Sequence, residues 1–268
     1  MNRINKKFKD LQIKNKKAFI SYITAGDPNI DLTEDIILSL IKSGVDIIEI
    51  GIPFSDPLAD GPTIQKAIER SLKNGCSVKK VFSLTKNLRK KTKDIPFIFM
   101  TYYNIIFSYG IENFVREAKK NGADGIIIPD LPLEEAQEIL NITKKEDFPL
   151  IMLVAPTTSN IRLKKIISIS DGFIYYVSLT GVTGTRTVLP TKIKENINKI
   201  KNITKIPLCV GFGISNEDQA KKISNLSDGI IVGSAIIKII ENNLNNKTLM
   251  IKKIEQFSKK IAKTVHKN

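Results

Sequence analysis

FISYITAGDPNIDLTEDIILSLIKSGVDIIEI, residues 19–50, contains the pattern that decides the fold. Its apolar runs FISYIT (19–24) and DIIEI (46–50) predict two strands. Between them, LTEDIILSLIKSG (32–44) repeats apolar residues at intervals of three and four, which predicts a helix with Gly44 as its C-terminal stop. This order of elements predicts two parallel strands that are joined by a right-handed crossover.

The same alternation continues to the end of the chain. Six further apolar runs, several bracketed by Asp-Gly or Pro, predict strands: FIFMT (97–101), DGIII (124–128), PLIML (149–153), FIYYVS (173–178), PLCV (207–210) and DGIIV (228–232). Helical periodicity recurs between them, for example at 112–122 and 216–224.

Eight near-continuously apolar strands, buried on both faces, predict a single (β/α)₈ TIM barrel over residues 1–268. The stretch before residue 18 is predicted to form an extra helix that covers the bottom of the barrel. A doubly wound open sheet is the alternative. That fold would need a Gly-rich turn after the first strand, where the chain has only TAGDP (24–28).

Composition narrows the class of protein. Of the 268 residues, 42% are hydrophobic and 26% charged, as in a soluble globular domain. We find no apolar run near the roughly 20 residues of a membrane span and no secretory signal, so we expect a cytoplasmic protein without a membrane partner. The net charge of +15 comes from scattered lysines without a nucleic-acid motif, so we expect no nucleic-acid partner.

Imidazole and thiol chemistry are not expected. Cys76 and Cys209 are too far apart in sequence for metal-ligand or redox spacing, and each is expected to be buried. The single histidine, His266, lies in a C-terminal segment that is expected to fray. We therefore expect no metal site, and catalysis would use carboxylates, hydroxyls, lysines or backbone dipoles.

Glu49 lies near the C-terminal end of the second predicted strand, where barrel enzymes hold their reactive groups. Alternation places Glu49 and Ile47 on one face of this strand, and Ile48 and Ile50 on the other. On either face the carboxylate loses hydration, so we expect its pKa to rise and the group to exchange protons near neutral pH. A structural role stays open, in which Glu49 pairs with a lysine or with backbone amides.

A long loop, GIPFSDPLADGP (51–62), follows this strand and carries Asp60. Three prolines stiffen the loop, and Gly61 permits a tight turn. Rigid placement of an acid over the barrel mouth is what a catalytic loop requires. Asp60 also precedes the helical stretch GPTIQKAIERSL, so capping that helix is an equally open role.

Glycine-bearing loops follow the last three predicted strands, at GVTG (181–184), GFG (211–213) and GS (233–234). Barrel enzymes frequently bind phosphate at these loops, through backbone N–H groups and the start of a short helix. SAIIKII, which begins at Ser234, is predicted to be that extra helix after the eighth strand. One glycine pair marks only a turn, but three in consecutive loops predict a phosphate site.

IEIGIPFSDPLADGPTIQ (48–65) resembles the signature segment of the tryptophan synthase α-subunit family. The resemblance continues in order along essentially the whole chain, through YITAGDP (22–28), PDLPLEE (129–135), APT (155–157), YVSLTGVTG (176–184) and GFGIS (211–215). It implies a lyase of tryptophan biosynthesis that cleaves indole-3-glycerol phosphate to indole and glyceraldehyde 3-phosphate.

The resemblance also implies roles for single residues. Glu49 would protonate indole C3 and help to deprotonate the glycerol hydroxyl, and Asp60 would hydrogen-bond the indole N–H and stabilise positive charge on the ring. Thr183 would close over Asp60. The remaining substrate-binding residues would be Tyr175 beside the glutamate, Phe212 in the pocket, and Gly184, Gly213, Gly233 and Ser234 at the phosphate.

Two positions depart from the family pattern. Tyr22 stands where the family often has phenylalanine, and Leu179 where many members have arginine. These departures affect pocket polarity and loop closure rather than the reaction.

The resemblance further implies an α₂β₂ heterotetramer with a β subunit that carries pyridoxal phosphate, while this chain needs no cofactor, metal or nucleotide of its own. Two other functions stay open: a stand-alone indole-3-glycerol phosphate lyase, and a catalytically silent subunit that only activates its partner. Intact Glu49 and Asp60 argue against the silent subunit, and the proline-rich loop at 51–62 favours the partnered enzyme.

Overall fold

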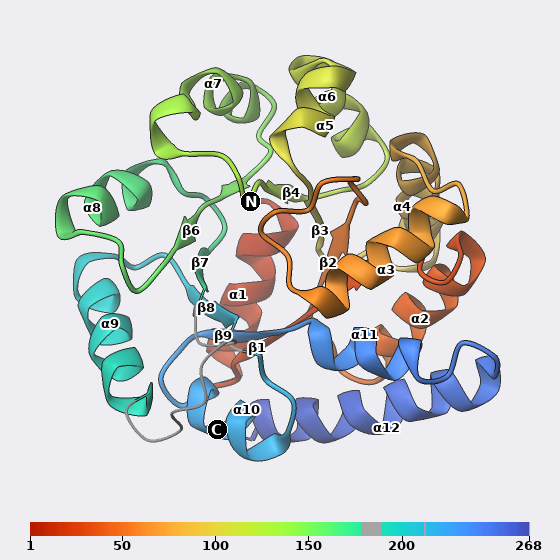
Figure 1. The fold of residues 1–268 in the computed structure, drawn as a ribbon. Coiled ribbons are helices and arrows are strands. Elements are labelled where there is room, and N and C mark those ends of the chain that lie inside the picture. Colours follow the sequence, from red (N-terminus) through yellow and green to blue (C-terminus); the bar gives the residue numbers. More distant parts are fainter. Residues whose placement is uncertain (178–188, 212, 268) are drawn as a thin grey trace.

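Residues 1–177, 189–211 and 213–267 are described by a computed structural model of the chain. Their strands form one parallel sheet in the order β5-β4-β3-β2-β1-β9-β8-β7-β6, and this sheet curls into a barrel with helices around it (Figure 1). The strands are β1 (Ala18–Thr24), β2 (Ile47–Gly51), β3 (Phe97–Met100), β4 (Gly125–Ile127), β5 (Leu150–Ile151), β6 (Leu153–Val154), β7 (Ile174–Val177), β8 (Leu208–Gly211) and β9 (Gly229–Val232). The predicted TIM barrel is confirmed.

The helices alternate with the strands as the periodicity predicts, and β2, β3, β4 and β9 are each followed by two helical elements instead of one. The helical elements are α1 (Arg3–Ile13), α2 (Ile30–Lys42), α3 (Pro62–Lys73), α4 (Val78–Lys91), α5 (Tyr103–Tyr109), α6 (Ile111–Lys120), the 3₁₀ turn η1 (Leu133–Glu135), α7 (Gln137–Lys145), α8 (Asn160–Ile169), α9 (Leu189–Ile203), α10 (Glu217–Ser224), α11 (Ser234–Glu241) and α12 (Lys247–Val265). None of these helices is long and apolar enough to cross a membrane.

The fifth strand was predicted as one element over 149–153, but in the structure it is divided into two at Met152. Its first half, β5, pairs with β4, and its second half, β6, pairs with β7. One segment therefore joins the two edges of the sheet, and it changes neighbour where the strand breaks.

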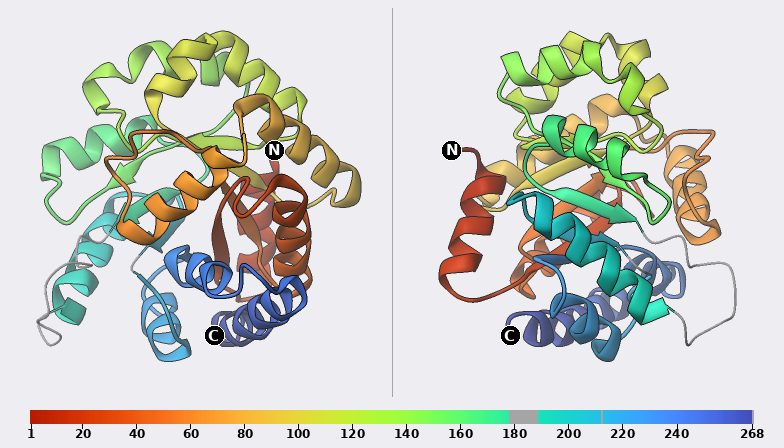
Figure 2. Two further views of the ribbon diagram at one scale, coloured as in Figure 1. Left: turned by 45° about the vertical axis from the view of Figure 1, so that its right-hand side comes forward. Right: turned by 90° about the vertical axis from the view of Figure 1, so that its left-hand side faces the viewer.

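The barrel interior has its own apolar core, which α1 closes from below. Side chains from alternate strand positions meet Ile4, Phe8 and Leu11 of α1, all buried. The strand residues of this core are Ala18, Ile20, Ile47, Ile98, Ile127, Ile151, Phe173, Cys209 and Ile231. In Figure 2, right, α1 lies at one end of the barrel and the loop before α3 at the other. The predicted N-terminal helix is thus confirmed at the bottom of the barrel.

Three aspartates at this bottom end each accept a hydrogen bond from the first backbone N–H groups of a neighbouring strand. Because a buried N–H needs a partner, these bonds fix where the adjacent strands begin. The pairs are Asp46 with Phe19 N (2.9 Å), Asp124 with Phe97 N (2.8 Å) and Asp228 with Leu208 N (3.0 Å). Two of them belong to the Asp-Gly signals that bracket the predicted strands.

His266 is not in a frayed segment, so that expectation is wrong. Helix α12 continues to Val265, and the His266 Nε2 atom lies 2.8 Å from Asp46 Oδ2. The two residues are 220 positions apart. The contact fastens the end of the chain to the start of β2.

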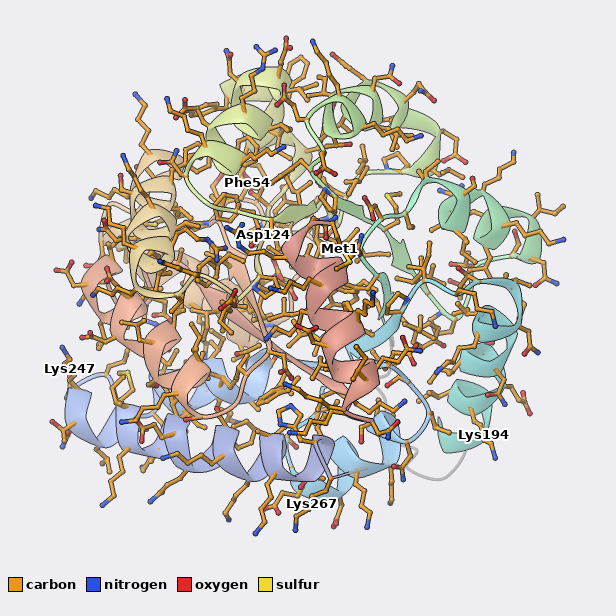
Figure 3. All side chains as sticks on the ribbon, turned by 180° about the vertical axis from the view of Figure 1, so that it is seen from behind. Met1, Phe54, Asp124, Lys194, Lys247 and Lys267 are labelled. Atoms are coloured by element: carbon orange, nitrogen blue, oxygen red, sulfur yellow. The ribbon has the colours of Figure 1, made fainter. Side chains whose placement is uncertain are left out.

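Asp124 is the most enclosed of the three aspartates, and Figure 3 labels it beside the start of α1. Arg3 Nη1 donates to its Oδ1 at 2.8 Å, and Arg89 Nη2 donates to its Oδ2 at 2.6 Å. Arg89 also lies over the Phe97 ring, 4.5 Å from its centroid. The carboxylate therefore ties α1, α4 and the β3–β4 pair together.

Asp124→Ala is expected to lower the free energy of unfolding by about 3–5 kcal/mol, because it leaves the largely buried Arg89 guanidinium and the buried Phe97 N–H without their shared partner. Urea denaturation would measure the loss. The control is Lys120→Ala, which removes an exposed pair with Glu117 and is expected to leave the stability nearly unchanged. Similar values for the two variants would contradict this account of Asp124.

Candidate functional site

A cavity of about 930 Å³ opens at the C-terminal ends of the strands, opposite α1. All of the predicted site residues that the structure describes line it: Glu49, Asp60, Tyr175, Gly213, Gly233 and Ser234. Tyr22 lines it as well. Thr183, Gly184, Phe212 and Leu179 lie outside the described residues. The strand-end loops therefore bring the predicted acids and part of the predicted phosphate loops to one cavity.

Glu49 points into the barrel from β2, since Ile47, two residues earlier, belongs to the interior core, and Ile48 and Ile50 pack toward the helices. Its side chain is fully buried, and neither carboxylate oxygen has a hydrogen-bond partner among the described residues. Pairing with a lysine or with backbone amides, the structural alternative, is therefore not observed. Burial first, and the Asp60 carboxylate second, raise the pKa of Glu49 to about 8.

Two tyrosines enclose Glu49 because glycines on the next strands leave them room. Tyr22 is the β1 partner of Glu49, and its hydroxyl occupies the space that a Cβ at Gly51 would fill. Tyr175 on β7 lies over Gly211, where a Cβ would come within 2.8 Å of its ring. Burial, with Asp60 and Glu49 among the nearby charges, raises the pKa of both phenols well above the usual value. Both hydroxyls therefore stay protonated.

Asp60 does not cap the helix that follows it. The N-cap of α3 is Gly61, without a side-chain hydrogen bond, and Asp60 Oδ2 instead accepts from the Tyr102 hydroxyl at 2.7 Å. Burial raises the pKa of Asp60, and the Tyr102 hydrogen bond partly opposes this. The capping role is therefore wrong, and Asp60 is free to face a ligand.

Tyr102 is a residue that the sequence reasoning missed. It lies two residues after β3, and a position just beyond the C-terminal end of a barrel strand was the signal that could have identified it. It stands within TYYN (101–104), where nothing distinguishes one tyrosine from the next. Its contact with Asp60, 42 residues earlier, becomes visible only in three dimensions.

The described part of the predicted phosphate site consists of Gly213 and the start of α11. Gly213 has a φ of 56°, which favours glycine, and the space where a Cβ would lie is open. Helix α11 begins at Ser234, and its N-cap Gly233 provides no side-chain hydrogen bond. The first N–H groups of α11 are therefore available to an anion.

Together these groups form a site for proton transfer. At neutral pH Glu49 is mostly protonated and can act as an acid, while Asp60 has a hydroxyl donor that favours its anion. Within the described residues, no three His, Cys, Asp or Glu side chains come together as metal ligands would.

Similar solved structures share this fold. Tryptophan synthase subunit alpha from Legionella pneumophila str. Paris superposes with a TM-score of 0.93 at 37% identity, covering 99% of this chain and 98% of that one. A chain of a tryptophan synthase structure from M. tuberculosis gives a TM-score of 0.89 at 30% identity, covering 99% and 100%.

Sequence comparisons agree over nearly the whole length. The family model described as tryptophan synthase alpha chain matches residues 8–266. The alpha chain of Caldanaerobacter subterraneus subsp. tengcongensis is 49% identical over 257 residues, covering 96% of this chain and 97% of that protein. The alpha chain of Methanocaldococcus jannaschii is 49% identical over 243 residues, covering 91% and 86%. This chain, with Glu49 and Asp60 among the residues that line the cavity at the mouth of the barrel, belongs to the tryptophan synthase alpha chain family.

Proposed function

We propose that Glu49 and Asp60 are the catalytic acids with which this lyase performs the reaction of its family, the cleavage of indole-3-glycerol phosphate to indole and glyceraldehyde 3-phosphate. One observation carries the assignment: a fully buried, unpartnered Glu49 shares a cavity with an Asp60 that has a hydroxyl donor. Burial raises the pKa of both carboxyls and the Tyr102 hydroxyl opposes the rise at Asp60, so the two acids have the different environments that acid/base catalysis requires.

The reaction needs one acid and one anion. Protonated Glu49 gives its proton to indole C3, and the indole N–H donates to Asp60, whose charge stabilises the cationic ring. Glu49, now anionic, takes the proton of the glycerol hydroxyl next to the ring. The oxygen becomes the aldehyde carbonyl, and the electrons of the broken carbon–carbon bond return to the ring as indole leaves.

The remaining cavity wall would bind and orient the substrate. We assign the phosphate to the amides of Gly184, Gly213 and Gly233 with Ser234, where the start of α11 favours an anion. Tyr175 would pack beside Glu49, Phe212 against the substrate, and Thr183 over Asp60. These groups would hold the substrate so that C3 faces the glutamate.

The same geometry favours a partnered enzyme. A similar chain occurs in a structure named tryptophan synthase, and the loop at the cavity mouth exposes Leu58, 93% accessible. We propose that a β subunit covers this face in an α₂β₂ complex and carries the pyridoxal phosphate, while this chain uses its own carboxyls without a cofactor. Family membership favours this reading over a stand-alone lyase or a silent activating subunit.

Glu49→Gln is expected to lower indole release about 10²–10⁴-fold, because an amide can neither give nor take the proton. The substitution keeps the size of the side chain, so the fold and substrate binding should persist. Steady-state assays with the purified chain would measure the loss, with circular dichroism as the folding control. Substantial activity in a folded variant would remove Glu49 from the mechanism.

The burial of Glu49 also predicts a pH dependence of stability. Its pKa is about 8 in the folded chain against an ordinary value of 4.5, so between these values the folded state binds more protons than the unfolded state. The stability contribution of the neutral acid is therefore complete below pH 4.5 and is lost as pH rises through 8, by at most about 1.4 kcal/mol per pH unit.

Because Glu49→Gln abolishes this titration, the variant should gain free energy of unfolding relative to the original chain between pH 5 and pH 8. Urea denaturation at both pH values would measure the difference. A difference that does not change with pH would mean that Glu49 is ionised inside the barrel.

A β subunit is expected to bind the cavity face and to speed indole release at least about tenfold, which needs only about 1.4 kcal/mol of differential binding. Titration of the β subunit would follow the rate together with hydrogen exchange in residues 51–61. Leu58→Asp should weaken the complex, whereas Ile13→Asp, exposed at the opposite end, should not. An unchanged rate at saturation would favour the stand-alone lyase.

A further inference from the structure

We propose that Tyr102 is a positioning residue for Asp60: its hydroxyl holds one carboxylate oxygen of Asp60 so that the other oxygen is presented to the indole N–H of the substrate. The inference rests on the role proposed above for Asp60.

The Tyr102 hydroxyl fixes both the side chain and the backbone at Asp60. It donates to Asp60 Oδ2 at 2.7 Å and accepts from the backbone N–H of Ala59 at 3.0 Å. Donating and accepting together leave the phenol oxygen little rotational freedom. Asp60 Oδ1 has no hydrogen-bond partner among the described residues, and Asp60 lines the cavity. One oxygen is therefore held and the other is available to a donor.

The loop that carries Asp60 has little other support. Its backbone bonds are local, from Leu58 N to Asp56 O and from Asp60 N to Pro57 O. In the described part of the chain, Tyr102 is the residue from outside the 51–65 segment that forms hydrogen bonds with residues 55–61. Within the segment, Gln65 Nε2 also donates to the Asp60 carbonyl at 2.9 Å, so Gln65 supports the backbone while Tyr102 alone among the described residues holds the Asp60 carboxylate.

Tyr102 is itself held firmly. It is only 5% exposed, and its ring lies 5.4 Å from the Phe54 ring. The next residue, Tyr103, donates its backbone N–H to Asp130 Oδ1 at 2.9 Å, which caps the start of α5. A rigid support of this kind is what precise placement of a reactive group requires.

The charges around Asp60 and Tyr102 support the same role for the phenol. The titratable groups around Asp60 and Tyr102 are Glu49 on β2, Tyr22 on β1, Tyr175 on β7 and Asp130 after β4. Burial, followed by the hydrogen bond to Asp60, raises the pKa of Tyr102 well above the usual value, so the phenol remains the donor. Burial raises the pKa of Asp60, and the hydrogen bond from Tyr102 opposes this rise. Removal of the hydrogen bond would therefore favour the neutral form of Asp60.

Tyr102→Phe tests the proposal, because it keeps the ring against Phe54 and removes only the hydroxyl. In the full-length chain, assayed alone and with saturating β subunit, kcat should fall about 10- to 100-fold. The acid limb of kcat against pH should move to higher pH, and the ¹³C resonance of the Asp60 carboxyl should titrate at higher pH as well. Tyr109→Phe, whose ring packs on Phe82 and Phe114, should change none of these values.

A double-mutant cycle separates positioning from an independent role. If Tyr102 acts through Asp60, Tyr102→Phe should add little further loss to Asp60→Asn. Losses that multiply in the double variant, or an unshifted Asp60 titration in Tyr102→Phe, would overturn the proposal while leaving Asp60 catalytic. Full activity in Asp60→Asn would instead overturn the proposed function, whatever the Tyr102 variant does.

Discussion

Glu49 is enclosed in the barrel without a hydrogen-bond partner among the described residues, and the chemistry of the site depends on this burial. The surrounding side chains keep water away from it. Tyr22 and Tyr175 fill the space over two glycines, and neither phenol carries a charge. Asp60 stands in a different environment, on a loop with a hydroxyl donor. Burial raises the pKa of both carboxyls, but only for Asp60 does a hydroxyl donor among the described residues oppose the rise, so the same functional group has two different environments within one cavity.

The carboxylates at the two ends of the barrel differ in how many hydrogen-bond and ion-pair partners they have. At the bottom, Asp46, Asp124 and Asp228 accept backbone N–H groups, and each also contacts a cationic or imidazole side chain. These hydrogen bonds and ion pairs hold the starts of the strands in place. At the mouth, Glu49 has no such partner and Asp60 has one phenol. Stability and reactivity are therefore carried by separate sets of acids, as is usual for this fold.

The sequence predicted what depends on local periodicity. The barrel, the covering helix and the shared face of Glu49 and Ile47 all follow from repeats of about 3.6 and 2 residues, whereas only the structure shows that this face points into the barrel. Contacts between distant segments of the chain could not be predicted from such local repeats. The break at Met152 depends on which neighbouring strands β5 and β6 meet, and the role of Tyr102 depends on a loop 42 residues earlier. Asp60 was ambiguous for the same reason, since capping and catalysis place the same residue at the same position.

The contact between His266 and Asp46 has a practical consequence, because the chain contains a single histidine. An NMR spectrum selective for imidazole would contain signals from one residue only, and that residue joins the last helix to the start of β2. Its chemical shift would differ between the bonded ring and one in free solution. The protein thus carries a built-in spectroscopic reporter of the contact between α12 and β2, and a change in this signal before a global probe of unfolding responds would show that α12 detaches first.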